Sequence, residues 1–567
     1  MKLLSFHTTL SLFLATVTLF AIAGCSEGVP GDRSMAMYAT DVSSESTSGN
    51  YAALSSSEKD VYLGESGNGD SVAAISENQY EVEEIYENPF RSVNTSPLST
   101  FSIDVDAASY SNVRGYLNRG EDPPAPAVRI EELVNYFSYA YPEPTGQHPF
   151  DFNTEVSDCP WNPEHRLVRV ALQGKEVAID NMPPSNLVFL IDVSGSMDSP
   201  DKLPLLKESF YALIDKLRPE DRVAIVAYAG EAGMVLPSTS GADKGAIRKA
   251  IDVLESGGST AGGAGITMAY KIAKKFYQEG GNNRVILATD GDFNVGISDD
   301  NELVKLIESK RDEGIFLSVL GFGTGNYQDR KMEGLADNGN GNYYYVDNLR
   351  EGKRILVSEL GSTLYTIAKD VKLQIIFNPA KVQAYRLIGY ENRVLAARDF
   401  DDDTKDAGEL GAGHSVTAFY EVVPVGAEVG YDVDHSNAAD YQNEGEENVA
   451  FAGNDLMAAR FRYKEPTAST SKLIEHHVSD NHRPITMATG EFKFAAAVAE
   501  WGMLLRGSGY GGKASFGQVA QLARAGLGED RDGYRLEFLT LVEKSASMRG
   551  ESLRGVMSVE GGGARIR

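Results

Sequence analysis

The middle of the chain constrains the fold most, because apolar runs alternate there with segments of helical periodicity. Each run between Asn186 and Thr363 is short and apolar at consecutive positions, which is typical of a parallel strand buried on both faces. The expected strands are residues 187–191, 223–228, 285–288 and 315–320, and the expected helices are residues 203–217, 244–254, 265–278, 302–311 and 348–364. Such alternation predicts an α/β fold with a doubly wound, mainly parallel sheet that helices cover on both faces.

The segments on either side of this α/β block show the period-two pattern of half-buried strands. They are residues 101–106, 152–156 and 166–172 before the block, and residues 371–377, 383–388, 416–423 and 456–463 after it. Because strands of one type flank the block on both sides, we expect the α/β domain to be inserted in a β-sandwich-like domain. Helical periodicity returns at residues 492–505, 517–525 and 534–544, which predicts a C-terminal helical region.

A chain of 567 residues is too long for a single hydrophobic core, and these patterns divide it into six parts. They are a signal peptide at 1–24, a disordered acidic tether at 25–97, an N-terminal α+β part of the sandwich at 98–185, the α/β domain at 186–366, the remaining sandwich part at 367–480, and the helical region at 481–567. The tether is expected because residues 26–97 are rich in Ser, Gly, Asp and Glu and have little apolar surface to bury.

The first 25 residues predict export. Lys2 precedes an apolar run over residues 10–23, which is too short and too close to the N-terminus for a spanning helix. The run ends in Ile22-Ala23-Gly24-Cys25, which resembles the lipobox of bacterial lipoproteins. That resemblance implies cleavage before Cys25, lipidation of its thiol and a place in the cell envelope, with the outer membrane favoured in a Gram-negative cell because Ser26 is not Asp. The alternative is an ordinary secretory signal that ends near a cysteine by chance.

Cysteine is scarce in this chain, which contains Cys25 and Cys159 only. If Cys25 is lipidated, Cys159 has no partner, so no internal disulfide is expected. No other stretch approaches the length of apolar chain that spans a bilayer, so the lipid is the expected attachment to the membrane.

The formal net charge of −28 limits the partners. A negative field repels phosphate backbones, which argues against nucleic acid, and it attracts cations. The alternative interpretation is that the acidic excess only keeps an exported protein soluble.

Polar side chains gather at three points of the α/β block. The strand at 187–191 leads into Asp192-Val-Ser194-Gly-Ser196, where alternate residues of an extended chain point the same way and bring a carboxylate and two hydroxyls together. Gly257-Gly-Ser-Thr260 precedes the helix at 265–278, and the strand at 285–288 leads into Thr289-Asp290-Gly291. Because open α/β sheets bind ligands at the carboxyl ends of their strands, we expect these groups to form one site.

With these motifs the block resembles the von Willebrand factor type A domain and its metal-ion-dependent adhesion site. Asp192, Ser194, Ser196, Thr260 and Asp290 fall on the five metal-coordinating positions of that family. The wider chain resembles a group of bacterial lipoproteins with this domain, through the segment from Asn88 to Asp106 and the region at 370–560.

The resemblance implies a metal cofactor and a protein partner. The ligand set is all oxygen, which suits Mg²⁺, or else Mn²⁺ or Ca²⁺, better than zinc or copper. In this family an acidic side chain of the partner supplies a missing ligand, and displacement of the last helix, here residues 348–364, accompanies tight binding.

The sequence contains no credible catalytic set, since it has neither His-Glu-x-x-His nor a Gly-x-Ser-x-Gly elbow around a plausible nucleophile. We therefore expect a binding protein rather than an enzyme, with no small-molecule substrate. The leading hypothesis is a membrane-anchored, divalent-metal-dependent, adhesion-type protein-binding module of the bacterial envelope. The alternative is a scaffold subunit of an envelope assembly with a structural metal site, and a third, metal-assisted hydrolysis, lacks a general base.

Overall fold

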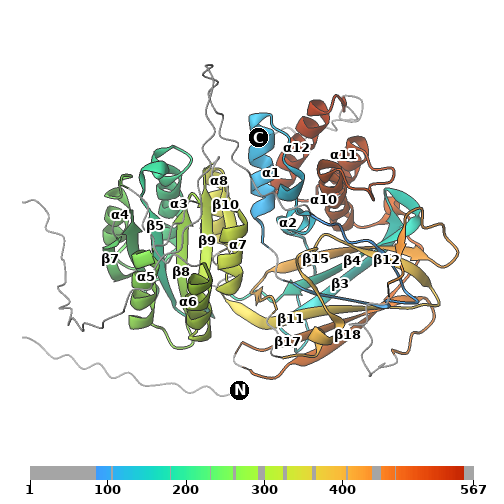
Figure 1. The fold of residues 1–567 in the computed structure, drawn as a ribbon, viewed down its shortest axis with the longest axis horizontal. Coiled ribbons are helices and arrows are strands. Elements are labelled where there is room, and N and C mark those ends of the chain that lie inside the picture. The colour runs from blue at the N-terminus through green and yellow to red at the C-terminus, as the bar shows by residue number, and fades with distance from the viewer. Residues whose placement is uncertain are drawn as a thin grey trace, which may run out of the picture. The chain divides into compact units, whose positions relative to one another are not determined.

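The computed structural model describes residues 85–103, 106–178, 181–229, 232–258, 263–291, 300–323, 329–359, 365–403, 407–436, 449–466 and 468–553 (Figure 1). The chain divides into the units Met1–Gln79 and Tyr80–Arg567, and the described residues all belong to the second. The expected signal peptide, Cys25 and most of the expected tether lie outside the described residues. None of the helices in the described ranges is both long and apolar enough to cross a membrane.

The α/β domain is built on a sheet in the order β10-β9-β8-β5-β6-β7. Its strands are β5 (Ser185–Asp192), β6 (Arg222–Tyr228), β7 (Ala232–Ser240), β8 (Asn282–Thr289), β9 (Phe316–Phe322) and β10 (Tyr343–Val346). Neighbouring strands are parallel except for β7, which pairs with β6 in the antiparallel sense. The sheet is therefore mainly parallel, as expected.

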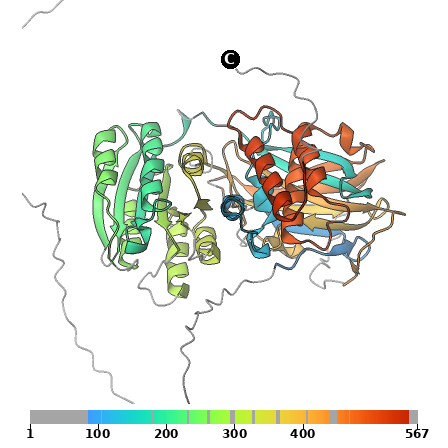
Figure 2. The same cartoon turned by 90° about the horizontal axis from the view of Figure 1, so that it is seen from above.

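Helices cover both faces of this sheet (Figure 2). They are α3 (Leu203–Lys216), α4 (Lys244–Asp252), α5 (Gly263–Lys275), α6 (Asp300–Asp312), α7 (Asp329–Asn338) and α8 (Leu349–Lys353). On β5, Leu187, Phe189 and Ile191 pack in the core with α3 and α4, whereas Val188 and Leu190 pack with α5, α6 and α7. Alternate side chains of a strand point to opposite faces, so a continuous apolar run is what a strand covered on both faces requires.

The flanking segments form two further sheets. One has the order β16-β1-β12-β15-β4-β3, and the other has the order β13-β2-β11-β17-β18 with β14 paired to β11. Their strands are β1 (Phe90–Ser92), β2 (Leu98–Ser102), β3 (Phe150–Cys159), β4 (Asn162–Gly174), β11 (Thr366–Phe377), β12 (Val382–Ile388), β13 (Val394–Leu395), β14 (Leu410–Gly411), β15 (Ser415–Pro424), β16 (Val433–Asp434), β17 (Asp455–Lys464) and β18 (Lys472–Ser479).

The two sheets share one hydrophobic core, to which Val168 of β4 and Tyr420 of β15 contribute from one sheet and Leu373 of β11 and Phe461 of β17 from the other. The α/β domain lies in sequence between β4 and β11, so it is inserted in this sandwich. The expected fold class is confirmed.

The helices outside the α/β domain pack on the outer face of the first sandwich sheet (Figure 1). They are α1 (Ala108–Arg119), α2 (Ile130–Asn135), α10 (Gly490–Arg506), α11 (Phe516–Ala525) and α12 (Tyr534–Met548). On β4, Leu167 and Ala171 face these helices, whereas Val168 and Val170 face the sandwich core. The free thiol of Cys159 is fully buried, and burial raises its pKa well above the usual value.

Two expectations about local structure are wrong. Residues from Phe90 onward belong to the sandwich and not to a tether: Phe90 is fully buried, and its ring stacks on Tyr431 with the centroids 5.4 Å apart. The segment 348–364 is not one α-helix, because α8 ends at Lys353 and continues as the π-helix η4 (Arg354–Glu359).

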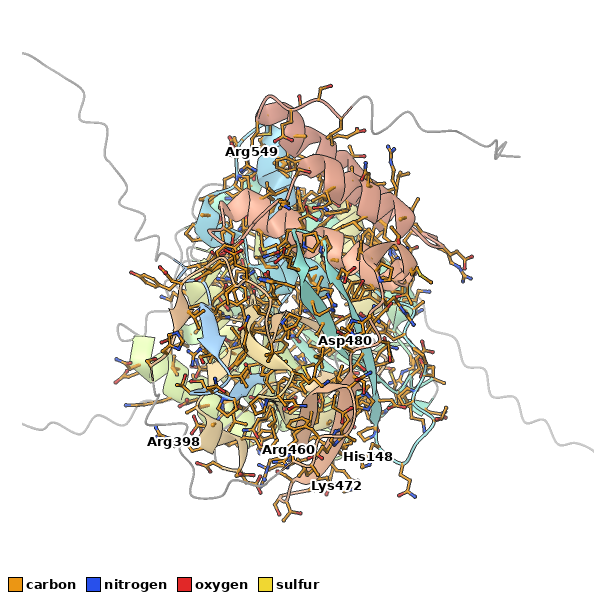
Figure 3. All side chains as sticks on the ribbon, turned by 90° about the vertical axis from the view of Figure 1, so that its right-hand side faces the viewer. His148, Arg398, Arg460, Lys472, Asp480 and Arg549 are labelled. Atoms are coloured by element: carbon orange, nitrogen blue, oxygen red, sulfur yellow. The ribbon has the colours of Figure 1, made fainter. Side chains whose placement is uncertain are left out.

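Seven strands of the described part of the chain were not expected from the sequence: β1, β7, β10, β13, β14, β16 and β18. β18 is mostly exposed, so it lacks the alternation that marks a half-buried strand. Arg460 of β17 and Lys472 of β18 mark this edge of the second sheet in Figure 3, and Arg460 Nε donates to Glu475 Oε2 at 2.7 Å across the strand pair.

Candidate metal site

The first loop of the candidate site follows β5 directly. Asp192 is the last residue of that strand, and its Oδ1 accepts a hydrogen bond from the backbone N–H of Ser194 at 2.8 Å. This bond turns the chain into the short helix η3 (Gly195–Asp198) and brings Ser194 Oγ within 3.1 Å of Ser196 Oγ. The motif therefore presents a carboxylate and two hydroxyls together, as the spacing predicts.

The second loop lies against the first through its backbone. Gly257 N–H donates to Val193 O at 2.7 Å, and Gly195 N–H donates to Gly258 O at 3.1 Å. A Cβ at Gly195 would lie 3.6 Å from that same carbonyl oxygen, so the two loops are in close contact. Thr260, the fifth expected ligand, lies outside the described residues, although the loop that leads to it reaches the site.

Asp290 brings the second carboxylate. It directly follows β8, which pairs in parallel with β5 so that Ala288 lies beside Ile191. Its side chain is 2% exposed, and Oδ2 accepts a hydrogen bond from Lys202 Nζ at 2.9 Å. Oδ1 is buried and has no hydrogen-bond partner within the described part of the chain.

Asp192 is fully buried and held in a fixed orientation. Besides the Ser194 N–H, its carboxylate accepts hydrogen bonds at Oδ2 from the Tyr228 and Thr289 hydroxyls, both at 3.2 Å. Burial raises the pKa of Asp192, and the negative charge of Asp290 raises it further, whereas the hydrogen bonds from Ser194 lower it. Two carboxylates in a buried site thus disfavour each other's charge, which a cation would relieve.

The donor set fits a hard divalent ion. The described donors are carboxylate and hydroxyl oxygens, which Mg²⁺, Mn²⁺ and Ca²⁺ prefer, and the unpartnered Oδ1 of Asp290 is available to a cation. Within the described ranges no group of three or more His, Cys, Asp or Glu side chains could hold a metal ion, so a set of the zinc-protease kind is not present there.

Sequence reasoning missed two residues of this site, Lys202 and Tyr228, and named Thr289 only as part of the motif around Asp290 and not as a donor to Asp192. Tyr228 is the last residue of β6, which pairs with β5, so its position beside Asp192 follows from the strand order. Lys202 lies six residues after Ser196, and this spacing alone does not predict that the lysine turns back to the site.

Comparisons with known proteins agree with this architecture. The family model described as "von Willebrand factor type A domain" matches residues 186–356, the model described as "Uncharacterized protein YfbK, C-terminal" matches residues 362–548, and the model described as "von Willebrand factor" matches residues 75–169. The protein YfbK of Escherichia coli (strain K12) is 42% identical over 464 residues, which cover 81% of this chain and 79% of the relative. The protein sll0103 of Synechocystis is 32% identical over 186 residues, 33% of this chain and 43% of that relative.

Solved structures add weaker likenesses. A von Willebrand factor type A protein from Catenulispora acidiphila covers 69% of this chain and 90% of its own, with 18% identity and a TM-score of 0.36. The ArnB paralog VWA2 from Sulfolobus acidocaldarius covers 70% and 98%, with 12% identity and a TM-score of 0.32. The identity to YfbK over most of both chains and the family match at residues 186–356 show that this chain belongs to the YfbK family of bacterial proteins that contain a von Willebrand factor type A domain.

Proposed function

We propose that this protein is a divalent-metal-dependent protein-binding module of the bacterial envelope. The observation that carries the proposal is the buried pair Asp192 and Asp290 at the carboxyl ends of adjacent strands, with one carboxylate oxygen left without a partner among the described residues. Membership of a von Willebrand factor type A family supports an interaction role.

The metal would be held by Asp192, Ser194, Ser196, Thr260 and Asp290. When bound, a divalent ion supplies a positive centre that attracts an anionic oxygen, and the partner side chain we propose is therefore a carboxylate. The residues of this chain do the positioning: Tyr228 and Thr289 orient Asp192, and the backbone contacts of Gly257 and Gly258 hold the second loop against the first.

Metal binding and metal-dependent capture test the proposal together. Calorimetric titration of the chelator-treated full-length protein with Mg²⁺ or Mn²⁺ should give a Kd between micromolar and millimolar, about −8 to −4 kcal/mol. Asp290→Ala should abolish the heat of metal binding, because it removes one of the two carboxylates of the site. The fold should survive the substitution, because Asp290 lies beyond the end of β8.

Envelope proteins crosslinked to the wild type in cells should be lost with chelator, return with Mg²⁺ or Mn²⁺, and be absent with Asp290→Ala. Asp252→Ala is the matched control, since Asp252 is an exposed carboxylate of the same domain at the end of α4. Equal heats for wild type and Asp290→Ala, or capture that chelator leaves unchanged, would refute metal-dependent binding and favour a scaffold subunit.

We also propose that a lipid on Cys25 anchors the protein in the cell envelope, with the outer membrane favoured if the cell is Gram-negative. Ile22-Ala23-Gly24-Cys25 supports this, as does the absence of Asp at position 26. Intact-mass analysis of membrane-extracted protein should show loss of residues 1–24 and addition of acyl mass. A Cys25→Ala protein should leave the membrane fraction, and one that remains there would contradict the anchor.

A further inference from the structure

Lys202 reaches into the candidate metal site from the residue that precedes α3. Its Nζ lies 2.9 Å from Asp290 Oδ2 and donates a second hydrogen bond to the Ser196 carbonyl oxygen at 3.0 Å. Both acceptors belong to residues of the proposed metal-binding set. We propose that Lys202 is a built-in counter-ion of this site, which offsets the charge of Asp290 when no metal is bound and lowers the affinity of the site for divalent cations. The inference rests on the proposed function, because it concerns the regulation of the same site.

The path of the Lys202 side chain is constrained by its surroundings. Gly323, which directly follows β9 and has a φ of +78°, lies beneath it: a Cβ at that position would overlap Lys202 Cε and lie 2.9 Å from both Cγ and Cδ. The Gly323 carbonyl oxygen accepts a hydrogen bond from the Tyr345 hydroxyl at 2.9 Å, which fixes this stretch of backbone. The lysine stem therefore lies in close contact with the end of a third strand and is directed towards Asp290.

This pair differs from an ordinary surface ion pair. The Lys202 side chain is 15% exposed and that of Asp290 is 2% exposed, so water screens their attraction weakly. Such a pair should weaken the binding of a cation to Asp290, because the Lys202 ammonium group already occupies one of its two carboxylate oxygens.

The charges around the site set the direction of the effect. Asp192, Asp290 and Lys202 carry a net charge of −1 without a metal and +1 with a divalent ion. Without the lysine the same states would carry −2 and 0, so a cation would enter a more negative site. Lys202 should therefore weaken binding of the bare ion, and it leaves the loaded site with an excess positive charge that an anionic ligand would neutralise.

A titration of the full-length protein in detergent with Mn²⁺, followed by the electron paramagnetic resonance signal of the free ion, tests the inference. Lys202→Met should bind Mn²⁺ roughly tenfold or more tightly than the wild type, which corresponds to at least about 1.4 kcal/mol. Lys216→Met is the matched control, because Lys216 ends the same helix about 20 Å away along its axis. That control should bind Mn²⁺ as the wild type does.

Thermal unfolding supplies a second measurement. With chelator, Lys202→Met should unfold at a lower temperature than the wild type, because two buried carboxylates then face each other without a cation. Saturating Mn²⁺ should remove that difference, whereas a lysine that only packs against Gly323 would give the same loss with and without the ion. If Lys202→Met does not fold, Lys202→Gln provides the same charge change with a side chain that can still hydrogen-bond.

The outcomes separate the two proposals. If Lys202→Met binds Mn²⁺ more tightly than the wild type and Lys216→Met does not, the result supports the counter-ion. Equal or weaker binding by Lys202→Met, while the wild type binds Mn²⁺ and Asp290→Ala does not, overturns the counter-ion and leaves the metal site standing. Absence of Mn²⁺ binding in both the wild type and Lys202→Met overturns the proposed function and the counter-ion with it.

Discussion

Two acidic clusters lie at the same edge of the α/β sheet and differ in how their charges are met. Asp192 ends β5 and Asp290 directly follows β8, and of these two carboxylates Asp290 forms an ion pair with Lys202. Asp347 follows β10, and with Glu351 on α8 it contacts the guanidinium of Arg114, which comes from α1 outside the domain. Carboxylates at equivalent strand ends thus form an open site around Asp192 and Asp290, in which one carboxylate oxygen has no partner among the described residues, and a closed cluster around Asp347 and Glu351, in which arginines pair with both carboxylates.

The second cluster is densely paired. Arg114 donates to both oxygens of Asp347 at 2.8 and 2.5 Å, and to Glu351 Oε2 at 2.8 Å. Glu351 also accepts from the Tyr136 hydroxyl at 2.6 Å and from Arg354 Nη2 at 2.7 Å. Burial alone would raise the pKa of Glu351, but Arg354 and Arg114 outweigh it and hold the pKa at about 2.

The supply of protein cations, and not the burial of the carboxylates, distinguishes the two clusters. Where two arginines from neighbouring elements reach the carboxylates, no exogenous ion is needed. Where a single lysine reaches one oxygen of Asp290, the other oxygen has no partner among the described residues, and there we propose that a divalent cation binds. The Arg114 cluster also fastens the end of the α/β domain to α1 and to α12, through Glu537 at 3.3 Å from Arg114.

The largest expected effect comes from removing the cation of the closed cluster. Arg114→Met should lower the free energy of unfolding by about 3–5 kcal/mol, because it leaves Asp347 buried without its arginine and leaves Glu351 with Arg354 as its remaining arginine. Urea unfolding at neutral pH measures the loss. Arg119→Met on the same helix is the control: its ion pair with Glu121 is exposed, so its loss should cost less than about 1 kcal/mol. Equal losses for the two variants would contradict the structural role of the cluster.

A somewhat smaller effect should appear on acidification. The pKa of Glu351 is lowered from 4.5 to about 2 in the folded state, so its stabilising contribution is present above pH 4.5 and is lost as the pH falls towards 2. The shift corresponds to about 3 kcal/mol. Urea unfolding of wild type and Glu351→Gln between neutral pH and pH 3 should show the gap between them narrowing below pH 4.5. A gap that stays constant over that range would show that the ion pairs with Arg354 and Arg114 contribute little.

The smallest effect should come from the open site. Tyr228→Phe removes one hydroxyl that donates to Asp192 Oδ2 while Thr289 still donates to it, so Mn²⁺ affinity should fall roughly two- to tenfold, or by about 0.5–1.4 kcal/mol. Calorimetric titration measures the change. Tyr211→Phe serves as the control, since that hydroxyl bonds to the exposed Asp252 and should not affect the ion. A loss as large as that of Asp290→Ala would show that Tyr228 does more than orient Asp192.

Local patterns predicted the parts of the structure that short stretches of chain decide. The apolar run at 187–191 predicted the central strand β5, because a strand buried on both faces must be apolar at every position. The spacing of Asp192, Ser194 and Ser196 predicted their convergence, since those residues lie within one turn of chain. The helices α10, α11 and α12 were expected from their periodicity, although their boundaries differ by a few residues.

The two wrong expectations, a tether that extends to residue 97 and a single helix at 348–364, came from weak local signals. The sequence around Phe90 is polar, so a single buried ring at the start of β1 did not stand out from the Ser-rich and Gly-rich segment before it. The switch from α8 to the π-helix η4 at Arg354 changes only the hydrogen-bond spacing and leaves the apolar pattern nearly intact.

Periodicity and neighbours a few residues apart were enough to predict the fold class, which the structure confirms, and to propose the acidic and hydroxyl residues of the candidate site. The charged groups that surround those residues come from distant parts of the chain. Arg114 meets Asp347 and Glu351 across 233 and 237 residues of chain, and Lys202 meets Asp290 across 88. Contacts between charged groups so far apart in sequence have no period and no local motif, so they depend on how the packed elements bring the chain together.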